Sequence, residues 1–146
     1  NDEQFLNTPS INNYDIGLGD LKLFYFNDKL YYYASYFDKN NKNIQISINY
    51  YDDNLKNNIV YTSFENNRIV QKNWSYVCDN IFIHSWYPIK LCSYNKKSNH
   101  LDVFKNIKTP EKFINARGNC PGILIGNYYY FILHKVQKNV INNKIL

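Results

Sequence analysis

The sequence predicts an all-β fold. Residues 21–26 and 30–36 form two short segments rich in tyrosine and phenylalanine, residue types that favour strands. Residues 43–50 alternate between isoleucine and polar residues, which is the period-2 pattern of a strand. No window keeps a 3.6-residue hydrophobic period for more than two turns, so long helices are not expected.

The first two segments predict a hairpin. They are separated by Asn27, Asp28 and Lys29, and Asn and Asp favour turns because their short side chains bond to nearby backbone groups. In the third segment Ile44, Ile46 and Ile48 share one face, so we expect a half-buried strand with its polar residues in solvent.

One short helix is expected among the strands. Residues 109–114 begin with Thr109 and Pro110, which suit the N-cap and the first helical position respectively.

The hairpin pattern recurs along the chain. Turns at Asp28, Asp79 and Asn127 each precede an aromatic or apolar strand, and they are spaced by about 50 residues, the length of a four-stranded propeller blade. The sequence therefore predicts a β-propeller-like fold of about three blades, each a short antiparallel four-stranded sheet. An ordinary β-sandwich in which three hairpins recur by coincidence is the alternative.

The repeat divides the chain into an N-terminal extension, residues 1–14, and a partial propeller, residues 15–146. Its units span residues 15–66, 67–115 and 116–146, the third being truncated. Because the 146 residues contain no methionine and too few units to close a propeller, we expect a piece of a larger protein.

Composition excludes several classes of protein. With 45% hydrophobic and 18% aromatic residues, the chain has the means to build a core and is not disordered. The longest apolar run, Tyr128 to Leu133, is far shorter than the roughly 20 residues of a membrane-spanning helix. The net charge of +5 comes mainly from scattered lysines, so nucleic acid is not the expected partner, since nucleic-acid sites concentrate basic residues on one face.

The cysteines predict neither a disulfide framework nor a metal site. Cys78, Cys92 and Cys120 are odd in number and form no Cys-x-x-Cys pair. Small buried thiols in a reducing, intracellular compartment are the favoured interpretation, and no metal or cofactor is expected.

An ordered set of motifs runs through the units. The set consists of Gly-Leu-Gly-Asp-Leu-Lys-Leu-Phe at 17–24, Lys-Asn-Trp at 72–74, Ser-Trp-Tyr-Pro-Ile-Lys-Leu-Cys at 85–92, Arg117-Gly118, Gly122, and His134 with Val136. Together they resemble motifs of the five-bladed β-propeller glycosidases and glycan phosphorylases. They are most similar to the propeller modules of glycosyltransferase-like proteins of large DNA viruses.

The resemblance implies a partial five-bladed propeller that recognises carbohydrate within a glycan-processing protein. It implies a glycan or a sugar phosphate as ligand, and the remaining blades or a fused transferase domain as partners. Its motifs make Asp20 the candidate catalytic acid. The candidate ligand-binding residues are Lys22, Lys72, Asn73, Trp86, Arg117 and His134.

Departures from the family pattern weigh against catalysis. Gly19 and Gln71 stand where the family has glutamate, and Lys22 stands where it has arginine. The motifs keep only Asp20 as a carboxylate, whereas glycoside hydrolysis uses two carboxylates. We interpret Glu65 and Asp79 as loop and turn residues.

Structural roles remain open for the candidates. Asp20 can satisfy backbone donors at a strand entry, Trp86 can be a wedge between blades, and His134 can be a structural histidine. A non-catalytic propeller fragment that serves protein assembly is the alternative function.

Overall fold

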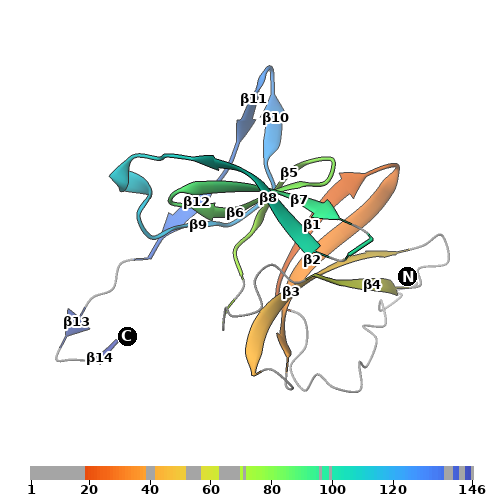
Figure 1. Ribbon diagram of the computed structural model, residues 1–146, viewed down its shortest axis with the longest axis horizontal. Coiled ribbons are helices and arrows are strands. Elements are labelled where there is room, and N and C mark those ends of the chain that lie inside the picture. Colours follow the sequence, from red (N-terminus) through yellow and green to blue (C-terminus); the bar gives the residue numbers. More distant parts are fainter. Residues whose placement is uncertain are drawn as a thin grey trace, which may run out of the picture. The chain divides into compact units, whose positions relative to one another are not determined.

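The computed structural model describes residues 19–38, 42–51, 57–62, 70, 72–95, 97–98, 100–136, 140–141 and 144–145 (Figure 1). The described chain is built from antiparallel strands and one 3₁₀ turn, so the all-β prediction is confirmed. It divides into two compact units, residues 1–72 with 94–102 and residues 73–93 with 103–146. Within the described residues, no helix is long and apolar enough to cross a membrane.

Two four-stranded sheets contain most of the strands. The first sheet has the order β1 (Gly19–Phe26), β2 (Lys29–Asp38), β3 (Asn43–Tyr51) and β4 (Asn57–Thr62). The second has the order β5 (Ser75–Cys78), β6 (Ile81–Trp86), β7 (Ile89–Asn95) and β8 (His100–Ile107). Consecutive strands are therefore neighbours in both sheets, as in a meander of hairpins.

The remaining strands form three small ladders. β10 (Ile123–Ile125) pairs with β11 (Tyr128–Tyr130), β9 (Ala116–Gly118) with β12 (Leu133–Lys135), and β13 (Val140–Ile141) with β14 (Lys144–Ile145). The β10–β11 hairpin therefore lies between the two strands of the β9–β12 ladder in sequence. The predicted N-terminal extension, residues 1–14, lies outside the described residues, as do Glu65 and Gln71.

The predicted first hairpin is confirmed, with a tighter turn than expected. Asn27 and Asp28 have φ values of 48° and 56°, and Lys29 already pairs with Phe26 as part of β2. Two central residues at positive φ are what a type I′ turn requires, and this turn matches the twist of the flanking strands. In the β10–β11 hairpin, Gly126 is the first residue of the turn and has a φ of 60°.

Aromatic residues from three strands form the core of the first sheet. The Phe24 ring stacks on Tyr31 at a centroid distance of 5.4 Å, and Tyr31 contacts Tyr50 at 5.3 Å. Tyr32 and Tyr33 of β2 are both almost fully buried although they point to opposite faces. The middle of this sheet is therefore covered on both sides.

The polar face predicted for β3 is also buried, which corrects the expectation of a half-buried strand. Ser47 and Asn49 are fully buried, as is Ile48 between them. The Asn49 amide donates to the Ser47 hydroxyl at 3.0 Å, and Ser47 Oγ donates to the Ala34 carbonyl at 3.5 Å. This chain of hydrogen bonds offsets part of the cost of burying polar groups.

The predicted helix is reduced to one 3₁₀ turn, η1 (Glu111–Phe113), and the N-cap assignment is wrong. Pro110 precedes the turn and no side chain caps it. The Thr109 hydroxyl instead donates to the Trp86 carbonyl at 3.0 Å, so a tertiary bond replaces the local cap.

We expect Ser47→Ala to lower the free energy of unfolding by about 1–3 kcal/mol, because it leaves the buried Asn49 amide without its acceptor. Ser35→Ala is the matched control, since its hydroxyl donates to the Gly19 carbonyl at 3.0 Å in a part-buried position that water can reach. Denaturant unfolding measures both. A loss at Ser47 no larger than that at Ser35 would contradict a role for the buried chain of hydrogen bonds.

Candidate binding face on the β9–β12 ladder

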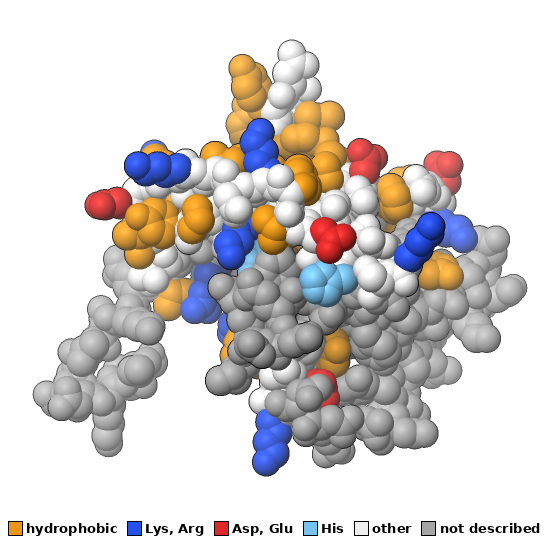
Figure 2. Space-filling view, viewed as in Figure 1, with side chains coloured by type: hydrophobic (Ala, Val, Ile, Leu, Met, Phe, Trp, Pro, Cys, Tyr) orange, Lys and Arg blue, Asp and Glu red, His pale blue; other side chains and the backbone are white. Residues whose placement is uncertain are grey.

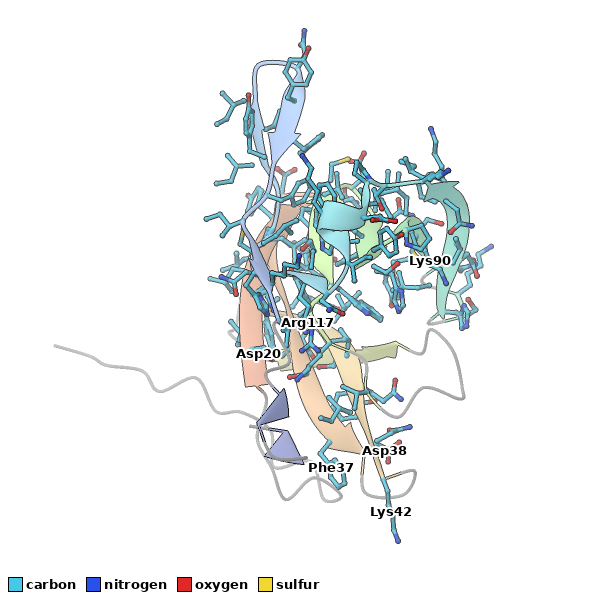
Figure 3. All side chains as sticks on the ribbon, turned by 90° about the vertical axis from the view of Figure 1, so that its left-hand side faces the viewer. Asp20, Phe37, Asp38, Lys42, Lys90 and Arg117 are labelled. Carbon is cyan, nitrogen blue, oxygen red and sulfur yellow. The ribbon has the colours of Figure 1, made fainter. Side chains whose placement is uncertain are left out.

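Two predicted ligand-binding residues lie directly opposite each other in the second unit. The register of β9 and β12 pairs Arg117 with His134, Gly118 with Leu133 and Ala116 with Lys135. Opposite residues of an antiparallel pair share one face with their Cβ atoms about 5 Å apart. Arg117, labelled in Figure 3, is half-buried, while His134 is exposed. The ladder thus makes Arg117 and His134 cross-strand neighbours.

Gly118 fixes which face of β9 carries Arg117. A methyl group at Gly118 would overlap Ser75 Oγ, and it would lie 2.8 Å from the Asn73 carbonyl oxygen and 3.2 Å from Trp86 Nε1. The Cβ side of Gly118 is therefore packed against the start of β5 and the end of β6. Because successive residues of a strand point to opposite faces, Arg117 is directed away from this contact.

The ladder continues beyond the assigned strands and adds a residue that the sequence analysis missed. The Asn119 N–H donates to the Ile132 carbonyl at 3.2 Å, and the Val136 N–H donates to the Asn115 carbonyl at 3.2 Å. By strand alternation, exposed Asn119 falls on the same face as Arg117. In the sequence, the only indication of Asn119 is that it lies two residues after Arg117. This spacing places the two side chains on one face only if β9 is a strand.

We call Arg117, His134 and Asn119 the β9–β12 polar face. It is rich in hydrogen-bond donors, and within the described chain no carboxylate forms an ion pair with Arg117. A guanidinium presents a planar fork that suits carboxylate or phosphate oxygens. Imidazole and amide groups both donate and accept, which suits sugar hydroxyls. The chemistry of the face thus fits an anionic or hydroxylated ligand.

Trp86 and Asn73 support the polar face from its buried side. Trp86 is buried, and its ring meets Phe131 edge-on at a centroid distance of 5.2 Å. Its faces are therefore not offered to a sugar ring in this structure. Asn73 adopts a φ of 62° and directs its carbonyl toward Gly118.

Trp74 lies in the core of the same unit. Its ring is 5.8 Å from the His84 ring and 6.4 Å from Phe82.

The other three candidates belong to the first compact unit. Asp20 is exposed with a φ of 53°, and its backbone carbonyl accepts a hydrogen bond from Lys22 Nζ at 3.2 Å. The Lys22 ammonium also lies 5.5 Å from the centre of the Tyr33 ring. Lys72 is exposed at the boundary of the unit. Asp20 and Lys22 thus meet through a backbone carbonyl and not through the carboxylate.

The described residues offer no group of three or more His, Cys, Asp or Glu side chains able to hold a metal ion. All three cysteines are free thiols, with Cys92 buried and the other two partly exposed. Comparison with family models, curated proteins and solved structures finds no match for this chain. The function is therefore argued from the geometry and chemistry of the side chains.

Tyr76 of β5 has a phenol whose pKa is strongly raised. Burial first, and then the charges of Cys78, Asp79 and Tyr129, raise the pKa of Tyr76 from 10.0 to about 12. A raised folded-state pKa stabilises the fold below the unfolded value, and this stabilisation is lost as pH rises toward the folded value.

We therefore expect the free energy of unfolding to fall between pH 10 and about pH 12, and Tyr76→Phe to remove part of that fall. Chemical denaturation at a series of pH values measures it. Tyr128→Phe, at an exposed position, is the matched control for loss of a hydroxyl. If the unfolding free energy of Tyr76→Phe and Tyr128→Phe depends on pH in the same way, Tyr76 would be excluded as the cause of the fall in stability.

We expect Gly118→Ala to destabilise the second unit by about 1–3 kcal/mol or more, because the added methyl overpacks the contact with Ser75 and Asn73. Ser75→Gly should recover part of the loss, since it removes the hydroxyl that the methyl would overlap. Gly126→Ala is the control. Its added methyl would meet no atom within 4 Å, so it should destabilise the fold only through the strain of a positive φ. If the changes in unfolding free energy of Gly118→Ala and Ser75→Gly simply add in the double mutant, the contact between these two positions would be contradicted.

Proposed function

We propose that the chain is a carbohydrate-recognising module of a glycan-processing protein, and that the β9–β12 polar face binds the ligand. The observation that carries the proposal is the register that sets Arg117 opposite His134. Asn119 extends the same face by one more hydrogen-bonding side chain.

The chemistry of the face points to an anionic sugar, such as a sugar phosphate. Arg117 supplies a fixed positive charge and a bidentate fork for the anionic group. His134 and Asn119 supply the mixed donors and acceptors that sugar hydroxyls need. Partial burial of Arg117 strengthens its interaction with an anion, because fewer water molecules screen the charge.

We further propose that the module has β-propeller architecture, part of a five-bladed propeller. In support, the turns recur about every 50 residues, and the two complete sheets are four-stranded meanders like propeller blades. In this proposal β10–β11 begins a third blade, and the remaining blades or a transferase domain are partners.

The proposed role is binding without bond cleavage. Hydrolysis needs two carboxylates roughly 5–9 Å apart across the bond. Asp20 is the only carboxylate among the candidate residues, and it lies in a different compact unit from the polar face.

Protein assembly is the second candidate function. It is favoured by the exposed apolar side chains of the β10–β11 hairpin, which carbohydrate recognition at the polar face does not use.

The test is binding of the chain to an array of neutral, carboxylated and phosphorylated glycans, followed by calorimetry with a hexose 1-phosphate. We expect Arg117→Ala to weaken binding at least tenfold. Arg117→Lys should weaken it less, since lysine keeps the charge and loses the fork. Lys105→Ala, which removes one exposed positive charge from β8, should leave binding unchanged. Equal binding by the parent chain and Arg117→Ala would overturn the assignment.

A further inference from the structure

An exposed isoleucine lies beside the β9–β12 polar face. Ile132 directly precedes β12 and is 65% exposed. Its carbonyl accepts the hydrogen bond from the Asn119 N–H at 3.2 Å, and its own N–H donates to Cys120 Sγ at 3.4 Å. Both backbone polar groups of Ile132 are therefore bonded, which fixes the residue next to Asn119.

The direction of the Ile132 side chain follows from its two neighbours in the chain. Phe131 packs against the buried Trp86 ring at a centroid distance of 5.2 Å. Leu133 is paired with Gly118, whose Cβ side is the packed side of β9. Both neighbours thus face the inside of the unit. Because successive residues of extended chain point to opposite sides, Ile132 is directed outward, onto the polar face.

The register places Ile132 opposite Asn119. The assigned pairs of the ladder reach Gly118 and Leu133, so the next pair is Asn119 with Ile132, and the backbone hydrogen bond between them agrees with this pairing. Opposite side chains have Cβ atoms about 5 Å apart, and diagonal neighbours such as Arg117 and Ile132 about 7–8 Å apart. An amide, an aliphatic side chain and a guanidinium thus lie within the span of a single sugar.

The surroundings of Ile132 differ from those of the exposed apolar residues on the β10–β11 hairpin. The tip of that hairpin shows hydrophobic side chains without charged ones (Figure 2). Ile132 instead adjoins the three hydrogen-bonding side chains of the polar face. Ligand sites combine apolar contact surface with a few polar groups that fix orientation. Ile132 supplies the apolar part of such a site.

We propose that the polar face, together with Ile132, binds a sugar that carries an acetamido group next to its anionic group. The inference rests on the proposed function of this face. An acetamido group is an amide joined to a methyl, and the opposed Asn119 and Ile132 match these two parts. Asn119 exchanges hydrogen bonds with the amide, Ile132 contacts the methyl, and Arg117 holds the anionic group.

A sugar with hydroxyl groups alone matches this surface less well. A hydroxyl placed against Ile132 loses hydrogen bonds to water and gains none from the side chain. One buried methyl and one amide hydrogen bond together favour the acetamido sugar by about fivefold to tenfold.

The test compares N-acetylglucosamine 1-phosphate with glucose 1-phosphate, which has a hydroxyl in place of the acetamido group. In titrations followed by saturation-transfer NMR, we expect the chain to bind the acetamido sugar about fivefold to tenfold more tightly. The acetyl methyl protons should receive the strongest saturation, since they contact Ile132. Ile132→Ser should bring the two affinities to within about twofold of each other, because it removes the apolar contact. Ile132 is mostly exposed, so the fold should be kept, and circular dichroism checks this.

Ile123→Ser is the matched control, since Ile123 is a 62% exposed isoleucine on β10, and it should keep the preference of the parent chain. An unchanged preference in Ile132→Ser would overturn the inference. If the parent chain binds both sugars equally and Arg117→Ala weakens both, the acetamido inference is wrong while the proposed function stands. If neither sugar binds, the inference is wrong as well, and the glycan array decides the proposed function separately.

Discussion

The close approach of the Gly118 backbone to Ser75 and Trp86 is the constraint on which the second unit depends. Only a residue without a Cβ fits there, so β9 packs against β5 and β6 with its inner face fixed. Strand alternation then directs Arg117 outward, and the β12 register brings His134 beside it. A packing requirement at one glycine thus determines where a charged side chain meets solvent.

Much of the fold could be predicted from the sequence because the strand signals are local. Aromatic segments, the alternation in β3 and the Asn-Asp turn each depend on near neighbours, and each matches an observed element. The errors lie where tertiary contacts override local preference. Thr109 bonds to Trp86 in place of capping a helix, and Ser47 and Asn49 of β3 are buried although their alternation with isoleucine is typical of a solvent-facing side.

The candidate site was harder to predict than the fold. The pairing of Arg117 with His134 depends on a register between strands separated by an intervening hairpin, which the sequence pattern does not define. Trp86 is a ligand-binding candidate in the sequence analysis, but its ring packs on Phe131 inside the unit. Asn119 was missed because its role follows only from its position on the ladder.

The buried polar row of β3 has a practical consequence for protein engineering. Because apolar and polar residues alternate in β3, a designer who wanted to improve solubility would choose positions 45, 47 and 49 for lysine or glutamate. Ser47 and Asn49 are fully buried and bond to each other, so charges there would lose their hydration. The hydrophilic residues Ser47 and Asn49 are therefore poor positions for charged replacements.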